Sequence, residues 1–126
     1  MSIARRLRGA VEPGILVGGV GAFALSYLLA RAWSTCDVGI NDAANSLELL
    51  FGLPCLWAVN TTMFVIVHAA LSGETRGRQL LALAAGTAAV LVLGVELFAW
   101  QGTPGTYPDP ICPGNIPPWW PSWIPT

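Results

Sequence analysis

Three long runs of apolar residues, separated by short polar segments, dominate the pattern of hydrophobic and polar positions along the chain. The runs cover residues 14–33, 48–71 and 80–100. Each has about the 20 residues that a helix needs to cross a bilayer. The pattern therefore predicts an all-α integral membrane protein, in which three transmembrane helices form an antiparallel bundle. A length of 126 residues is typical of one domain, so we expect residues 1–126 to form a single membrane domain.

Four further segments flank these runs: residues 1–13, 34–47, 72–79 and 101–126. The first is a short basic lead-in that ends at Pro13, a residue that suits the first turn of a helix. In the outer loop, Asn41 or Asp42 is a candidate N-cap for the second helix, and in the inner loop Thr75 is a candidate N-cap for the third. The inner loop is short, so the second and third helices must be antiparallel neighbours.

Small residues recur at every fourth position of the first run. They are Gly14, Gly18, Ala22, Ser26 and Ala30. Residues four apart share one face of a helix, so this row predicts a ridge that a neighbouring backbone can approach closely. The row does not distinguish a helix of the same chain from a second copy. The third run carries a similar face, made by Ala82, Ala85, Gly86 and Ala89.

The second run differs from the others because it carries polar residues at mid-depth: Asn60, Thr61 and Thr62. A polar side chain in hydrocarbon must find an internal partner, because no water is present there. One interpretation is an interhelical hydrogen bond of about 1 kcal/mol. The other is a polar lining for a pore or a ligand. Within the same run, Pro54 removes a backbone donor and predicts a kink near Leu50.

Ionisable residues near the ends of the runs are candidate sites, because charge is costly inside a membrane. Glu96 lies one turn before Trp100, at the outer end of the third run, and Arg31 lies near the same boundary on the first. Glu48, at the start of the second run, is a competing candidate for a contact with either of these two residues. These residues predict a structural ion pair, a carboxylate that reaches the lipid headgroups, or a relay for protons or cations. His68, near the opposite boundary, has no cysteine or carboxylate at ligand spacing, so no metal or cofactor is expected.

Composition and charge support a membrane location and set the orientation. Only 10% of the residues are charged, against about a quarter in soluble proteins, and the mean hydropathy is +0.60. The formal net charge of −1 indicates no nucleic-acid partner. Five of the six arginines precede the first run or lie between the second and third. The positive-inside rule therefore predicts a cytoplasmic N-terminus and an extracytoplasmic C-terminus, most simply in a bacterial plasma membrane.

The composition changes abruptly in residues 101–126, which contain eight of the ten prolines and three of the six tryptophans. Such a proline density excludes a helix or a central strand and predicts polyproline and turn conformations. Trp119, Trp120 and Trp123 carry large apolar rings that need burial. We therefore expect the tail to fold back over the outer helix ends as a cap. Its aromatic residues could instead bind a polysaccharide or a peptide.

The three cysteines predict a link between this tail and the outer loop. In the predicted topology Cys36 and Cys112 lie on the same, oxidising side, whereas Cys55 lies about two turns into the second helix. A Cys36–Cys112 disulfide would stabilise the fold by about 2–4 kcal/mol, and Cys36–Cys55 is the rival pairing. Neither pair forms a CxxC motif, so the sequence does not support thiol–disulfide catalysis of that type.

The sequence contains no phosphate-binding loop, no serine–histidine–acid set and no metal motif, and we therefore expect a protein that is not an enzyme. One candidate function is a structural or accessory subunit, which uses its helix faces and its Trp-rich cap to bind another membrane protein or further copies of itself. The other is a homo-oligomeric channel or transporter unit. Its path through the lipid bilayer would be lined by Asn60, Thr61, Thr62 and Glu96. Three helices cannot enclose such a path, so the second function requires several copies.

Overall fold

The computed structural model describes residues 2–36, 42–102 and 112–126. This part of the chain contains three long helices, α1 (Ile3–Thr35), α2 (Asp42–Leu71) and α3 (Arg76–Gln101), and one short 3-10 helix, η1 (Pro113–Asn115). Each long helix is long and apolar enough to cross a membrane. The predicted all-helical architecture with three helices of spanning length is therefore confirmed.

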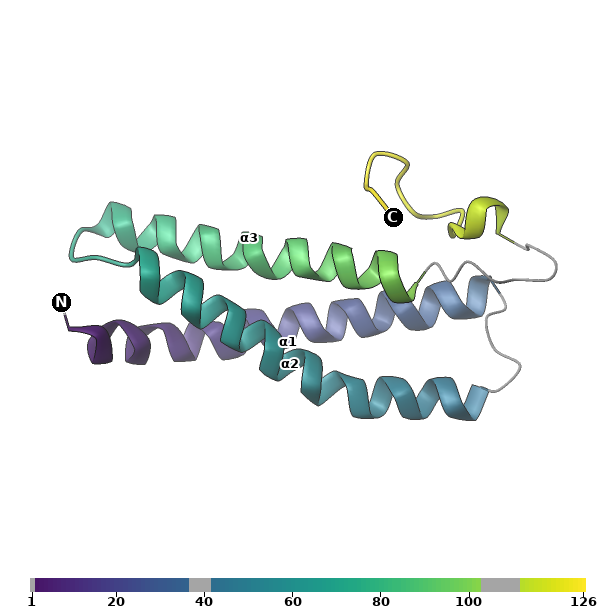
Figure 1. Ribbon diagram of the computed structural model, residues 1–126, viewed down its shortest axis with the longest axis horizontal. Coiled ribbons are helices and arrows are strands. Elements are labelled where there is room, and N and C mark those ends of the chain that lie inside the picture. Colours follow the sequence, from purple (N-terminus) through teal and green to yellow (C-terminus); the bar gives the residue numbers. More distant parts are fainter. Residues whose placement is uncertain (1, 37–41, 103–111) are drawn as a thin grey trace.

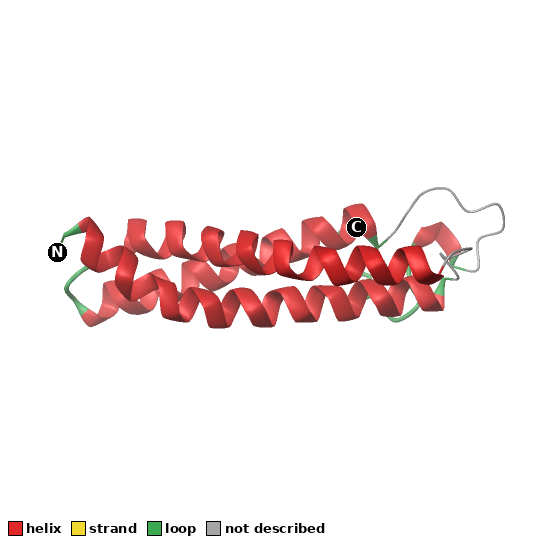
Figure 2. Ribbon diagram, turned by 90° about the horizontal axis from the view of Figure 1, so that it is seen from below, coloured by secondary structure: helices red, strands yellow, loops and turns green. Residues whose placement is uncertain are grey.

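The three long helices lie side by side along the long axis of the molecule (Figures 1 and 2). At 1.5 Å per residue they are about 40–50 Å long, which exceeds the hydrocarbon core of about 30 Å. The N-terminus and the turn between α2 and α3 lie at one end (Figure 1), which we call the arginine end. The end of α1 and residues 112–126 lie at the other, which we call the disulfide end.

α1 begins at Ile3, whereas the sequence predicted a helix from residue 14 after a basic lead-in. Ser2 caps the helix, because its hydroxyl oxygen accepts a hydrogen bond of 3.4 Å from the amide of Arg5. Pro13 lies inside α1 and not in its first turn. A proline removes only one helical hydrogen bond, and the alanine, leucine and arginine residues before it favour a helix. The basic segment is therefore an extension of α1.

The other helix boundaries follow local capping and proline chemistry. Thr75 caps α3, as predicted, by accepting a hydrogen bond of 3.3 Å from the amide of Arg78. α3 consequently begins at Arg76, four residues before the predicted start. The N-cap position of α2, Asn41, lies outside the described residues. Pro54 lies inside α2, and the ribbon of this helix changes direction part-way along its length (Figure 1).

Phe64 of α2 packs in the half of the bundle nearer the arginine end, where it is fully buried between glycines of the two neighbouring helices. A methyl group added at Gly14 of α1 would lie 3.2 Å from the Phe64 ring, and one added at Gly86 of α3 would lie 2.8 Å from it. The glycines thus provide the space that the ring occupies, which lets the three helices approach closely. Substitution of either glycine would push the ring or the helices apart.

The small-residue ridge of α1 is used inside the chain. Gly14, Gly18 and Ala22 are buried, and a methyl group at Gly18 would lie 2.8 Å from the backbone nitrogen of Thr61 in α2. Towards the disulfide end the ridge leaves the packed face, since Ala30 is exposed. On α3, Ala82 and Gly86 are buried. The sequence left open whether a second copy packs against this ridge. The buried positions of the ridge offer such a copy no free surface.

Candidate functional site

The polar residues in the middle of α2 divide between two faces of the helix. Asn60 is only 2% exposed, and its amide nitrogen donates a hydrogen bond of 3.4 Å to the backbone oxygen of Gly18. Thr61 is turned towards the same part of α1, and its hydroxyl oxygen is buried without a hydrogen-bond partner in the described structure. Thr62 is exposed, and its hydroxyl donates to the oxygen of Ala58 in its own helix.

A second α1–α2 hydrogen bond lies one turn away from Asn60. The indole nitrogen of Trp57 donates to the backbone oxygen of Ile15 at 2.9 Å. The Trp57 ring also covers Gly19, where a methyl group would lie 3.0 Å from it. The polar groups at mid-depth therefore join α1 to α2, and the structure does not bring Asn60, Thr61 and Thr62 together along one path.

His68 lies in the last turn of α2, where the sequence placed it near the arginine end. Its ring stacks on Phe64, with the centroids 5.5 Å apart, and its Nδ1 atom is buried without a hydrogen-bond partner among the described residues. Across the described residues, no group of three or more histidine, cysteine, aspartate or glutamate side chains could hold a metal ion. The arrangement around His68 is therefore one of aromatic packing.

Arg31, Glu48 and Glu96, the charged candidates from the sequence near the disulfide end, do not pair as the sequence suggested. Arg31, Glu48 and Glu96 are all exposed, and within the described part of the chain no salt bridge joins Arg31 to either acid. The guanidinium carbon of Arg31 instead lies 5.4 Å from the centroid of the Trp119 ring. This is the geometry of a cation–π contact, which contributes about 0.5–1 kcal/mol at an exposed site. Sequence position gave the depth of Arg31 but not the side of the helix on which it lies.

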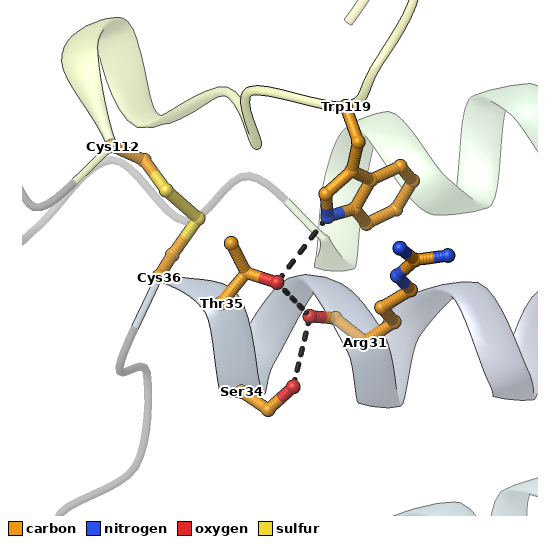
Figure 3. Close-up of a disulfide and its surroundings, with 6 residues drawn as sticks. All are labelled: Arg31, Ser34, Thr35, Cys36, Cys112 and Trp119. Atoms are coloured by element: carbon orange, nitrogen blue, oxygen red, sulfur yellow. Dashed lines mark hydrogen bonds between the residues drawn. A yellow bond between two sulfur atoms is a disulfide. The ribbon is translucent and has the colours of Figure 1, made fainter.

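Cys36 and Cys112 form a disulfide at this end, with their Cα atoms 5.4 Å apart (Figure 3). The rival pairing of Cys36 with Cys55 is absent, and Cys55 is a free, exposed thiol. Beside the disulfide, the indole nitrogen of Trp119 donates to the hydroxyl oxygen of Thr35 at 3.3 Å, and that hydroxyl donates to the oxygen of Arg31. The disulfide, the hydrogen bond from Trp119 to Thr35 and the cation–π contact between Arg31 and Trp119 thus join the tail to the end of α1.

Aromatic stacking holds the tail to α3 as well. Phe98 is 1% exposed, and its ring lies 4.0 Å from the ring of Trp120 and 6.1 Å from that of Trp119, measured between centroids. Trp33 of α1 contributes to the same cluster and donates a hydrogen bond of 2.9 Å to the oxygen of Gln101. We call residues 112–126 the outer cap, after their position at the disulfide end of the bundle. Unlike Trp119 and Trp120, Trp123 of the outer cap is 81% exposed.

A cavity of about 310 Å³ lies between the three helices towards the disulfide end. Leucine and tryptophan side chains form most of its wall, and Ser26, Glu48, Cys55 and Gln101 contribute the polar groups. The hydroxyl oxygen of Ser26 is buried, without a hydrogen-bond partner in the described residues. The amino-acid sequence does not reveal this cavity, because leucines that line a cavity follow the same hydropathy pattern as leucines in a packed core. Its only sequence signal is Pro54, which lies in α2 between the lining residues Gly52 and Cys55.

Comparison of the chain with protein-family models, with curated proteins and with solved structures finds no match.

Proposed function

We propose that the chain is a small, non-enzymatic integral membrane protein that acts as a structural or accessory subunit of a membrane complex. It binds its partner through the outer cap. One observation carries this proposal: Trp123 is 81% exposed in a segment that a disulfide and an aromatic stack hold against the helix ends. A large ring held outward at low cost in conformational entropy is typical of the residues that dominate protein interfaces.

The internal use of the helix faces supports the same assignment. Gly14, Gly18 and Gly86 pack against α2 of their own chain, so these small-residue contacts already have a partner. Docking through the ridge of α1 would require the bundle to open. The outer cap has no such constraint, because Trp123 projects from it without a covering side chain.

The charge distribution supports a topology for this subunit. Three of the arginines lie in the first turns of α1 and two at the start of α3, all at the arginine end. By the positive-inside rule this end is cytoplasmic, and the outer cap with its disulfide is extracytoplasmic, where cysteines are oxidised. The protein is then a multi-pass protein of the plasma membrane, with its three helices antiparallel.

The experiment is native mass spectrometry of the protein gently solubilised from its own membrane. We expect a stoichiometric complex with a larger membrane protein. The variant Trp123→Ala should lose the complex, whereas Phe51→Ala should retain it. Phe51 is the matched control because it is also a largely exposed aromatic residue, at 69%, but lies on the membrane-spanning part of α2. A closed homo-oligomer of four or more copies would contradict the proposal and favour a channel. A monomer in all three samples would contradict both.

A further inference from the structure

The cavity between the helices has the length of one bilayer leaflet. Its lining on α1 runs from Leu25 to Trp33 and on α2 from Glu48 to Val59. At 1.5 Å per residue these stretches are about 12 and 17 Å long. Half of the hydrocarbon core is about 15 Å. The cavity therefore extends from the membrane surface at the disulfide end to near the middle of the bilayer.

The wall of the cavity is suited to hydrocarbon. Leu25, Leu29, Leu49, Leu56 and Leu97 line it, and Trp33 and Trp100 stand at its outer end. A wall made mostly of leucine and tryptophan side chains favours hydrocarbon over water. If it stayed empty, its wall would lose dispersion contacts. In a membrane, the molecules beside it are lipids, whose chains have the matching length and chemistry.

A carboxylate lies at the outer end of this cavity. Glu48 is the outermost lining residue of α2, it is exposed, and no described basic residue forms a salt bridge with it. Glu48 begins the predicted membrane-spanning part of α2, which corresponds to the level of the lipid headgroups. An anion at that level favours a lipid that carries an ammonium group.

From these observations we infer that the cavity is a binding site for one membrane lipid with an amine headgroup. A hydrocarbon chain of the lipid fills the space between α1, α2 and α3, and its ammonium group pairs with Glu48. The lipid would bridge the parts of α2 and α3 that line the cavity, so the site would also stabilise the outer half of the bundle. This inference does not rest on the partner proposed for the outer cap.

The test uses two glycine variants that make the same chemical change. A Cβ atom added at Gly52, which lines the cavity, or at Gly94, which does not, meets no atom within 4 Å. Native mass spectrometry would count phosphatidylethanolamine molecules bound to each protein. We expect one bound lipid for the wild type and for Gly94→Leu. For Gly52→Leu we expect the occupancy by lipid to fall at least about fivefold, because the leucine side chain takes the space of the lipid's hydrocarbon chain. Equal occupancy in both variants would overturn the proposal.

Glu48→Gln tests the headgroup separately. With phosphatidylethanolamine and phosphatidylglycerol of the same chains, we expect the wild type to prefer the amine by about two- to fivefold. Glu48→Gln should bind both lipids equally. A wild type without this preference would overturn the assignment of Glu48.

Cys55 provides a readout that requires no substitution, in case Gly52→Leu fails to fold. Cys55 is a free thiol that lines the cavity, whereas the other two cysteines form the disulfide. When phosphatidylethanolamine is added back to lipid-depleted protein, the alkylation of Cys55 by N-ethylmaleimide should become slower. An unchanged rate would overturn the proposal. A second outcome would also overturn it: the wild type forms a dimer that binds no lipid, and Gly52→Leu dissociates this dimer. A second copy of the protein would then fill the cavity.

Discussion

The ring of Phe98 lies nearly parallel to the ring of Trp120, with an angle of 13° between the planes and 4.0 Å between the centroids. This contact joins the last turns of α3 to a proline-rich tail that makes few backbone hydrogen bonds of its own. Together with the disulfide to α1, it fastens the outer cap to two different helices. The cap is thereby held without regular secondary structure beyond η1.

A double-mutant cycle measures this contact. We expect Phe98→Leu and Trp120→Leu to show a coupling free energy of about 0.5–1.5 kcal/mol, which is typical of aromatic pairs beyond their buried area. The measurement is reversible unfolding in mixed micelles. Trp123→Leu is the control, because Trp123 is exposed and makes no ring contact with Phe98 in the described structure. Additive effects of the two substitutions would contradict the stack.

Removal of the disulfide should destabilise the protein. The double variant Cys36→Ser, Cys112→Ser should lose about 2–4 kcal/mol of unfolding free energy, because the unfolded chain is no longer cross-linked. Cys55→Ser is the control and should have little effect, since Cys55 is exposed. Thiol counting in denaturant provides the direct check. We expect one reactive thiol before reduction and three afterwards, and three thiols before reduction would contradict the disulfide.

Gly18→Ala should destabilise the contact between α1 and α2. The added methyl group would lie 2.8 Å from the backbone nitrogen of Thr61, which cannot move without its helix. Overpacking of this kind costs about 1–3 kcal/mol. Gly94→Ala makes the same change in open space and should be neutral or slightly stabilising, since alanine favours a helix. Equal thermal stability of the two variants in detergent would show that the helices do not approach at Gly18.

Asn60→Leu distinguishes a structural from a conducting role for the polar residues of α2. Asn60 donates to the backbone of Gly18, and interhelical hydrogen bonds in membranes contribute about 0.6 kcal/mol on average. We therefore expect a loss of stability below about 2 kcal/mol, while ion leakage through vesicles containing the protein stays unchanged. Thr62→Val, at an exposed neighbouring position, serves as the control. A loss of ion flux specific to Asn60→Leu would contradict the packing role.

Features that depend on residues near one another in sequence were predictable. The three apolar runs predicted three helices of spanning length, and Thr75 marked the start of α3. The sequence predicted Pro13 in the first turn of a helix, where proline is favoured. That preference does not reveal that Ser2 has already started the helix eleven residues earlier. The spacing of Gly14 and Gly18 predicted a packing face but not its partner, which depends on the position of Phe64 and Thr61.

Features that depend on the rotation of one helix relative to another were not predictable. Arg31 and Glu96 lie near the same boundary, yet Arg31 contacts Trp119. Leu25, Leu29 and Trp33 form the buried face of α1, and Arg31 lies on its exposed face, a distinction that hydropathy does not resolve. The cavity is a further example, because its wall combines residues of all three helices.

The disulfide also determines how the molecule transmits force. Cys36 and Cys112 are 76 positions apart, and α2 and α3 both lie between them. A pull on the two chain ends therefore passes along α1, across the sulfur atoms and through the outer cap, while α2 and α3 stay in a closed covalent loop that bears no load. Extraction of the oxidised protein by its ends would remove α1 as a linear segment, and reduction would be needed before α2 and α3 could be pulled out in turn.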